Sequence, residues 1–310
     1  NDIVVILTDP PLLNILASPL IKFRGGIIVN WLQDLFPEVA VGAGILLQES
    51  LLNKFIIKIR NNSLNTANMN VVIGNHMKDY LIKNDIHIDK ITRIPNWADG
   101  DLIKPIDNNV NYLRKEWGLE GSFVVGYSGN LGRAHDVLTI LSTISKLKNN
   151  NQIVFLFIGG GVGIQKIKKY VSENQLHNVI FKPYQARKLL HLSLGAADLH
   201  WVTLEPQMEA FIVPSKIYGI LAAAKPVIFL GDKNGELAKV ISKIGCGKVV
   251  EIGNSDIMVS TIKEFSRDLS SIKIMGNLGR VEFQSMYELN ISVRKFSVLF
   301  QKLTDSLKIV

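Results

Sequence analysis

The stretch FVVGYSGNLG, residues 123–132, joins a run of apolar residues to a turn that contains two glycines. The run is apolar on both faces, which is typical of a parallel strand covered by helices on each side. The glycines that follow let the backbone approach a ligand, and a helix is expected to begin soon after them. This order of strand, glycine turn and helix predicts an α/β domain.

Similar apolar runs recur along the whole chain and alternate with stretches of helical period, without an internal repeat. The expected strands are Ile3–Leu7, Ile27–Trp31, Val71–Ile73, Ile91–Ile94, Phe123–Tyr127, Val154–Ile158, Val179–Phe181, Leu199–Val202, Val227–Leu230 and Lys248–Val250. The alternation predicts α/β architecture throughout.

A domain boundary is expected in IPNWADGDLIKPID, residues 94–107, where Pro, Asn, Asp and Gly cluster between two α/β halves. We therefore predict a first domain over residues 1–103, a second over 104–290 and a final helix in 291–310 that packs on a domain. Each half resembles a Rossmann-like sheet, and a cleft between two such sheets is the natural ligand site.

Composition narrows the class of protein. The chain has 310 residues, 47% of them hydrophobic and 20% charged, and a single cysteine, Cys246, which excludes an internal disulfide framework. The single cysteine suits a reducing compartment, so we expect a cytoplasmic protein. No apolar run approaches the ~18 to 20 residues of a membrane span, and the N-terminus lacks the order of a signal peptide, so no membrane-spanning segment is expected. Because the chain begins at Asn1 with a buried-type strand, we expect the first domain to be incomplete at its start.

The net charge of +8 comes from the second part of the chain, because residues 1–103 hold 9 Lys/Arg against 10 Asp/Glu and the remainder holds 26 against 17. Without an aromatic-rich or helix-turn-helix signature, this excess favours a solvated basic face over nucleic-acid binding.

The stretch FIVPSKIYGILAAAKPVIF, residues 211–229, suggests a second feature. Pro214 suits the first turn of a helix, and Ser215 and Lys216 then lie beside unpaired backbone donors at its positive end. Such an end is either an anion site or an ordinary helix start.

Five stretches resemble the GT-B retaining glycosyltransferases of family 4, above all bacterial enzymes that build exopolysaccharide, capsule or O-antigen sugars. They are IVNWLQDLFPE (28–38), IPNWADGDLIKP (94–105), VVGYSGNLGRAHD (124–136), FLFIGGGVG (155–163) and VPSKIYGILAAAKPVI (213–228). The resemblance implies that the first domain binds the acceptor, that the second binds a nucleotide-diphosphate sugar, expected to be UDP-linked, and that the last helix crosses back to the first domain. It implies hexosyl or N-acetylhexosaminyl transfer to a saccharide or polyprenyl-diphosphate-linked acceptor, without a metal or other cofactor.

The resemblance also implies site residues. Donor phosphates would be bound by Gly129, Asn130, Gly132, Arg133, His135, Gly160, Pro214, Ser215 and Lys216. Glu209 would contact the donor sugar, with Glu205 as a competitor, and the family's second glutamate falls near Gly219, which has no side chain. The catalytic set would be Glu209, Lys216, Arg133 and Asp34; Asp34 either orients an acceptor hydroxyl or caps the next turn. The Asp99-Gly100-Asp101 triplet has the spacing of a metal motif but lies in the linker, so no metal site is predicted.

Two questions stay open from the sequence. Residues 51–60, LLNKFIIKIR, place apolar side chains on one helical face, which fits peripheral membrane contact or, the interpretation we favour, a helix that covers the sheet. The chain is a transferase, or it is a truncated or non-catalytic nucleotide-sugar-binding protein. A nicotinamide oxidoreductase is disfavoured because Lys166 stands where the third glycine of a dinucleotide loop belongs.

Overall fold

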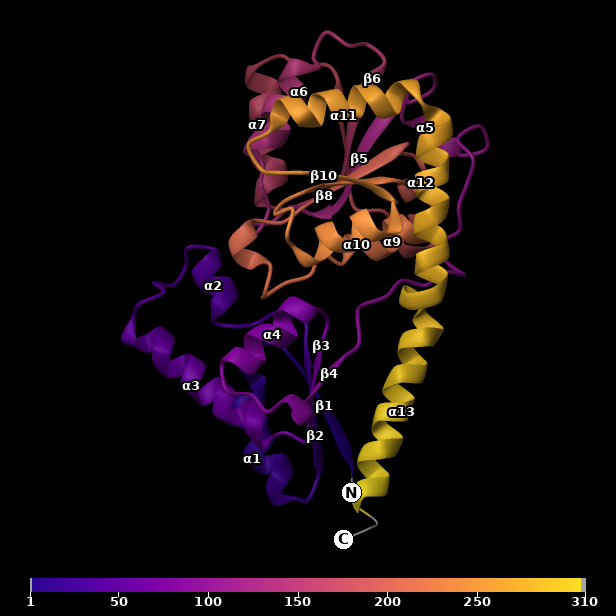
Figure 1. Ribbon diagram of the computed structural model, residues 1–310. Helices are drawn as coiled ribbons and strands as arrows, with labels where there is room; N and C mark the ends of the chain where they lie inside the picture. Colours follow the sequence, from indigo (N-terminus) through magenta and orange to yellow (C-terminus); the bar gives the residue numbers. More distant parts are fainter. Residues whose placement is uncertain (1, 308–310) are drawn as a thin grey trace. The chain divides into compact units, whose positions relative to one another are not determined.

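The computed structural model describes residues 2–307 and divides the chain into two compact units (Figure 1). Unit 1 comprises residues 1–96, 207–213 and 290–310, and unit 2 comprises residues 97–206 and 214–289. The first division falls between Asn96 and Trp97, inside the stretch expected to hold the boundary. There the Asp99 carboxylate accepts hydrogen bonds from the backbone N–H groups of Asp101 and Leu102, at 3.1 and 3.0 Å, so Asp99 caps a turn.

Unit 1 contains a four-stranded parallel sheet in the order β1-β2-β3-β4. The strands are β1 (Ile3–Leu7), β2 (Ile27–Leu32), β3 (Met69–Val72) and β4 (Ile91–Arg93). The helices are α1 (Leu13–Phe23), α2 (Glu38–Gly42), α3 (Leu51–Thr66), α4 (Asn75–Lys83) and α13 (Leu289–Leu307), with a short 3-10 turn at Ile88–Lys90.

Alternation along β2 explains how the sheet is covered on both faces. Ile27 and Val29 pack with Phe296 and Leu299 of α13, whereas Ile28 packs with Ile21 of α1 on the other face. The long α13 is drawn in yellow in Figure 1.

Three helices of unit 1 are tied together by buried charge. The Arg60 guanidinium of α3 donates two hydrogen bonds to the Glu38 carboxylate of α2, at 3.0 and 2.6 Å. The Tyr80 hydroxyl of α4 donates to the same carboxylate at 2.8 Å. A buried, bidentate and fully hydrogen-bonded pair fixes geometry, and it sets the position of the chain just after β2.

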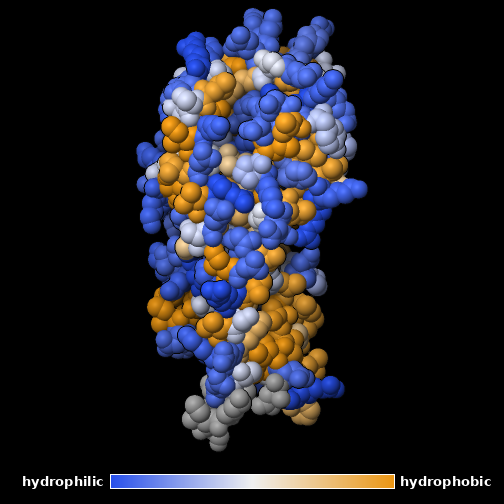
Figure 2. Space-filling model, turned by 90° about the vertical axis from the view of Figure 1, so that its right-hand side faces the viewer, coloured by the Kyte–Doolittle hydropathy of each residue, from blue (hydrophilic) through white to orange (hydrophobic). Residues whose placement is uncertain are grey.

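Unit 1 nevertheless exposes many large apolar side chains, and Figure 2 shows hydrophobic side chains gathered over part of it on the face that is drawn. In α3 the buried residues are Asn53, Arg60, Ser63 and Leu64. Leu51, Leu52 and Phe55 are 86%, 56% and 60% exposed. The interpretation of residues 51–60 as a sheet-covering apolar face is therefore wrong for the first turn and a half of α3, because the helix buries a largely polar face there.

Unit 2 contains a six-stranded parallel sheet in the order β10-β9-β8-β5-β6-β7. The strands are β5 (Phe123–Asn130), β6 (Ile153–Gly160), β7 (Val179–Lys182), β8 (Leu199–Thr203), β9 (Val227–Leu230) and β10 (Gly247–Val250). The α-helices are α5 (Tyr112–Glu116), α6 (Leu138–Lys146), α7 (Val162–Glu173), α8 (Leu190–Gly195), α9 (Lys216–Ala222), α10 (Glu236–Ile244), α11 (Ser255–Arg267) and α12 (Leu269–Glu282). Short turns of other helix types lie at Arg187–Leu189 and Phe283–Tyr287, and a third, Pro206–Met208, lies where the chain passes from unit 2 to unit 1.

Both faces of this sheet are covered, as the apolar strands require. Val125 packs in a cluster with Ile144 of α6 and Ile262 of α11, and Val124 packs with Trp117, directly after α5, and with α8 on the opposite face. Together with the solved structures reported below, the two parallel sheets confirm the predicted α/β fold.

All ten expected strands are present, with ends that differ by up to three residues. β5 and β6 show an informative difference, because they run on into the glycines that the sequence suggested as turns.

Candidate nucleotide-sugar site

The order of strands in unit 2 locates its ligand site. From β5 the chain winds to one side through β6 and β7 and then returns to the other side through β8, β9 and β10. The strand order thus reverses between β5 and β8. Doubly wound sheets bind ligands outside the carboxyl ends of the strands at such a switch point.

Glycines shape the backbone at this edge. The β5–β6 ladder continues through Gly129 opposite Gly159 and Asn130 opposite Gly160. Gly129, Gly159 and Gly161 have φ values of 125°, 126° and 108°, which residues with side chains rarely adopt. A Cβ on Gly159 would lie 2.4 Å from the Gly129 carbonyl oxygen, so a side chain cannot fit there. The carboxyl ends of β5 and β6 therefore present adjacent backbone without side chains at this edge of the sheet.

Lys216 reaches this backbone from α9. A Cβ on Gly129 would lie 2.8 Å from Lys216 Cε, and Lys216 Nζ is 5.5 Å from the centre of the Tyr127 ring. Burial lowers the pKa of Lys216, since removal from water disfavours the charged form. The two phosphate candidates of the sequence, Gly129 and Lys216, are thus brought together. The helix begins slightly later than expected, with exposed Ser215 at its N-cap and buried Pro214 before it.

His135 lies beside the same turn. Its Nδ1 is 3.1 Å from the Gly132 nitrogen and accepts a hydrogen bond from that N–H group. Burial and the nearby Lys216 charge together lower the pKa of His135 to about 4. The ring is therefore neutral at pH 7. Nδ1 is also 3.3 Å from the Gly132 carbonyl oxygen, and the tautomer that accepts from the Gly132 N–H group carries its proton on Nε2, where it can donate to an anion.

The turn itself is internally fixed. The Tyr127 hydroxyl donates a hydrogen bond of 2.8 Å to the Asn130 carbonyl oxygen, and the Leu131 N–H group donates to the Gly160 carbonyl at 2.9 Å. These hydrogen bonds fix the backbone conformation from Asn130 to Gly132. The Arg133 side chain is exposed, and across residues 2–307 no hydrogen bond or ion pair of Arg133 is found, so its phosphate role stays a prediction.

Of the two glutamates considered for the donor sugar, Glu205 is the one that lies in unit 2. Its N–H group donates to the Ala134 carbonyl at 2.9 Å, which joins the chain after β8 to the turn after β5. Burial raises the pKa of the Glu205 carboxyl, and the neighbouring Asp136 raises it further.

Tyr184 was missed by the sequence reasoning. Its ring lies against the glycines after β6, since a Cβ on Gly159 or on Gly160 would be 3.1 or 3.3 Å from ring carbons of Tyr184. The side chain is 62% exposed, so one ring face is open to a ligand. The only signal in the sequence is an aromatic residue two positions after the end of β7.

Glu209 lies in unit 1, not with the helix of Lys216 that follows it in the chain. Its carboxylate is 3.8 Å from Nδ1 of His76, and its side chain is 11% exposed. The predicted second domain, 104–290, had included this segment.

Asp34 also lies in unit 1, at the carboxyl end of β2, where it forms an isolated antiparallel bridge with Ile212. Burial raises the pKa of Asp34, and Asp9 raises it further. The neighbouring Gln33 and Asn96 side chains exchange two hydrogen bonds of 3.0 and 2.6 Å. In the part of the chain that the structure describes, no hydrogen bond from a turn to the Asp34 carboxylate is found, and its role toward an acceptor hydroxyl stays a prediction.

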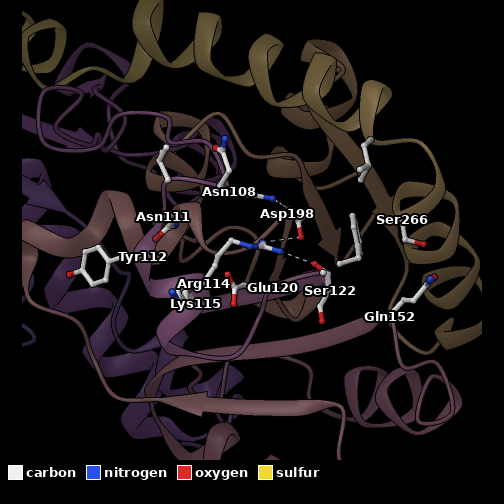
Figure 3. A pocket seen from close by; sticks show the side chains of 15 residues that line it. Asn108, Asn111, Tyr112, Arg114, Lys115, Glu120, Ser122, Gln152, Asp198 and Ser266 are labelled. Atoms are coloured by element: carbon white, nitrogen blue, oxygen red, sulfur yellow. Dashed lines mark hydrogen bonds and ion pairs between the residues drawn. The ribbon is translucent and has the colours of Figure 1, made fainter.

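A cavity of unit 2 lies elsewhere, at the amino ends of the strands (Figure 3). It has a volume of about 750 Å³. The Arg114 guanidinium there bonds Asp198 at 3.1 Å and the carbonyl groups of Ala196 and Ser122 at 2.7 Å each. Asp198 also accepts a hydrogen bond of 2.8 Å from the Val124 N–H group. These charges hold the fold together and are not available to a ligand.

Two searches complete the description of residues 2–307. In this part of the chain no group of three or more His, Cys, Asp or Glu side chains is arranged to hold a metal ion. Among the same residues no helix is both long enough and apolar enough to cross a membrane.

Comparison with known proteins places the chain among sugar transferases. The family model described as glycosyl transferases group 1 matches residues 110–280. The probable glycosyltransferase WbjE of Pseudomonas aeruginosa is 30% identical over 316 aligned positions, which cover 100% of this chain and 76% of WbjE. The putative colanic acid biosynthesis glycosyl transferase WcaI of Escherichia coli K12 is 22% identical, over 79% of this chain and 61% of WcaI.

Solved structures share the fold. Anabaena HepE in complex with UDP and glucose has a TM-score of 0.79 at 15% identity, over 97% of this chain and 78% of HepE. A sucrose-phosphate synthase from Thermosynechococcus elongatus has a TM-score of 0.75 at 16% identity, over 94% of this chain and 72% of that structure. These likenesses confirm the GT-B type of fold that the sequence predicted.

Proposed function

Because the chain belongs to the glycosyl transferases group 1 family, we propose that it transfers a hexosyl or N-acetylhexosaminyl group from a UDP-linked donor, with retention of configuration, to a saccharide or lipid-linked saccharide acceptor. The pathway would be synthesis of a surface polysaccharide; the name of the relative WcaI assigns that protein to colanic acid biosynthesis. One observation carries the proposal: a partly buried ammonium, Lys216, lies against the bare backbone of Gly129 at the switch point of unit 2.

In this proposal the donor diphosphate binds at that place. The charge on the diphosphate grows when the bond between it and sugar carbon C1 breaks, and the Lys216 ammonium stabilises the growing charge most in this partly desolvated position. The Nε2 proton of His135 and the exposed Ser215 hydroxyl would add neutral donors. The new bond joins C1 to the acceptor oxygen, and the acceptor proton passes to the departing diphosphate.

The nucleobase would lie on Tyr184. The ring has one face against Gly159 and Gly160 and is 62% exposed, and a planar base stacks on such a surface. HepE, which shares the fold, was solved with UDP, and this is the basis for expecting uracil here.

Two carboxylates complete the proposal. Glu209 would accept hydrogen bonds from donor-sugar hydroxyls, and Asp34 would orient the acceptor hydroxyl. The raised pKa of Asp34 fits a carboxyl group kept away from water at the end of β2.

The experiment is a titration of the unchanged protein with UDP, GDP and ADP and their glucose conjugates, followed by analysis of any product by NMR. Tight binding of UDP compounds and a product with the anomeric configuration of the donor support the proposal. Binding without transfer to any saccharide or lipid-linked acceptor would instead favour a non-catalytic nucleotide-sugar-binding protein. Binding of none of the nucleotides would refute both.

We extend the proposal to peripheral contact with the inner face of the membrane. The loop before α3 and its first turns expose Ile45, Leu47, Leu51, Leu52 and Phe55 by 63%, 80%, 86%, 56% and 60%. Five large apolar side chains within eleven residues form a patch of the kind that inserts into a lipid interface. A lipid-linked acceptor would be reached from that position.

Sedimentation with phosphatidylglycerol vesicles tests this contact. Serine at positions 51, 52 and 55 together should abolish co-sedimentation, because each buried apolar side chain adds to membrane affinity. The matched control carries serine at Ile274, Leu278 and Val281 of α12, which are 61%, 44% and 64% exposed. Equal loss of co-sedimentation in both variants would show nonspecific hydrophobic adsorption to the vesicles and not a specific membrane-binding face.

A further inference from the structure

The cavity at the amino ends of the strands of unit 2 has no part in the proposed transfer. Its volume of about 750 Å³ lies within the roughly 300–1,000 Å³ that is typical of sites for small organic ligands. A second cavity of about 620 Å³ adjoins it, because four residues line both, among them Asn109 and Asp198. β5 runs from Phe123, in the wall of the first cavity, to Asn130 at the phosphate turn. At about 3.3 Å per residue the two places are roughly 20 Å apart, so a ligand in the cavity is separate from the donor.

The charged side chains that line these cavities balance one another. Each cavity is lined by two basic and two acidic side chains, and the Arg114 guanidinium is paired with the Asp198 carboxylate at 3.1 Å. A wall without net charge gives no advantage to a nucleotide or another anion. The four residues are Arg114, Lys115, Glu120 and Asp198 in the first cavity and Asp107, Asp198, Lys225 and Lys273 in the second.

Side chains that can bind hydroxyl groups are exposed in the wall of the first cavity. Asn109 and Gln152 are exposed, and across residues 2–307 no hydrogen bond of either side-chain amide is found. Tyr112 is 52% exposed, and Figure 3 shows Tyr112 and Gln152 on opposite sides of Arg114. An amide both donates and accepts hydrogen bonds, as a sugar hydroxyl does, and an exposed aromatic face offers a flat apolar surface to the C–H groups of a sugar ring.

The loop that carries Asn109 is held in place by its neighbours. The Asn108 side-chain amide donates a hydrogen bond to the Asp198 carboxylate. The buried Asn111 side-chain amide donates one of 2.8 Å to the Leu192 carbonyl. The backbone on both sides of Asn109 is therefore fixed before a ligand arrives, which lowers the entropy lost on binding.

We propose that these adjoining cavities bind a neutral oligosaccharide, at a second site separate from the donor site. The balanced charge favours a neutral ligand over an anion, and the exposed amides favour a ligand rich in hydroxyl groups over an apolar one. All the lining residues belong to unit 2, so the site is complete within that unit. The inference goes beyond the proposed function, because the site uses neither Lys216 nor Tyr184. The product of the proposed transfer would be a saccharide of this kind.

The test is a titration of the unchanged protein with maltotetraose, cellotetraose and N-acetylchitotetraose, followed by saturation-transfer difference NMR. At least one of them should bind. Tyr112→Ser should weaken that binding about tenfold, because an aromatic packing surface is lost. Gln152→Ala, from another part of the chain, should weaken it about three- to tenfold through a lost hydrogen bond. Both substitutions are at exposed positions and should leave UDP affinity within about twofold.

Tyr184→Ser is the matched control, because it removes an exposed tyrosine of the same unit at the donor site. It should weaken UDP binding and leave saccharide binding unchanged. The inference is overturned if none of the three saccharides binds, or if Tyr112→Ser and Gln152→Ala leave their binding unchanged. Tighter binding of an acidic probe, hyaluronan tetrasaccharide, would overturn it as well. A protein that binds the neutral saccharides at Tyr112 but binds no nucleotide would support this site and refute the proposed function.

Discussion

Replacement of Lys216 by methionine separates the charge of this residue from its packing. Methionine keeps an unbranched apolar stem against Gly129 and Tyr127 and removes only the ammonium. Two unit charges 4 Å apart interact by about 4 kcal/mol at an effective dielectric constant of 20, which is an upper limit for the contact with one phosphate charge. Because water competes in the free state, the net contribution of a hydrogen bond to a charged group is about 1.5–3 kcal/mol.

At about 1.4 kcal/mol per factor of ten, Lys216→Met should weaken UDP binding by roughly 10- to 100-fold. Titration calorimetry with UDP measures this directly. The thermal midpoint should stay the same or rise, since burial already disfavours the charged ammonium, as the lowered pKa of Lys216 shows.

Lys248→Met provides the matched control. Lys248 Nζ also lies over an aromatic ring, 5.6 Å from the centre of Phe265, but it is at the amino end of β10. Its replacement should leave UDP affinity unchanged. An affinity of Lys216→Met within twofold of the unchanged protein, with the fold intact, would refute the assignment of the diphosphate to Gly129 and Lys216.

Three further predictions concern stability and pH. Gly159→Ala should lower the thermal midpoint and weaken UDP binding together, because a Cβ there would meet the Gly129 carbonyl at 2.4 Å and φ is 126°; an unchanged midpoint in calorimetry would contradict the geometry. Arg114→Met should cost about 3–5 kcal/mol in urea unfolding, since it leaves the buried Asp198 carboxylate without its guanidinium, and should not alter UDP affinity in the fraction that folds. His135 in the unfolded chain binds a proton below about pH 6.5, whereas the pKa of His135 in the folded protein is about 4. The contribution of His135 to the free energy of unfolding is therefore complete above pH 6.5 and falls as the pH drops toward 4. His135→Asn should reduce this pH-dependent loss of stability in unfolding curves measured from pH 7 to 4.

The sequence predicted the strands well because each one is a short apolar run that must be covered on two faces. It predicted the ends of β5 and β6 less well. Gly129 and Gly159 suggest turns by residue type, yet their backbones stay in the ladder, opposite each other. Only the pairing partner shows this, because the absence of a Cβ at position 159 matters through its closeness to the carbonyl of residue 129.

The sequence could predict which candidate site residues lie close together only where they follow strands at the same edge of the sheet. The turn after β5 and the helix of Lys216 are far apart in the chain, but both follow strands at the carboxyl edge of the sheet. The two segments that the sequence suggested separately for phosphate binding therefore lie next to each other. Tyr184 had no such signal, since a single aromatic residue in a polar turn has no periodicity. The position of Glu209 was not predicted for another reason. Met208 and Phe211 pack on unit 1, so the short segment 207–213 belongs to that unit, and chain order alone does not indicate this.

The buried charged groups of residues 2–307 include some that are paired with an opposite charge and some that are not. Glu38 with Arg60, and Asp198 with Arg114, are buried and mutually hydrogen-bonded. Lys216 and Asp34 differ, because neither has an ion pair anywhere in residues 2–307. Burial lowers the pKa of Lys216 and raises the pKa of Asp34, so each is moved toward its uncharged form. A fold gains nothing from such groups by themselves, and a compensating charge or hydroxyl brought by a substrate would repair the loss at both positions.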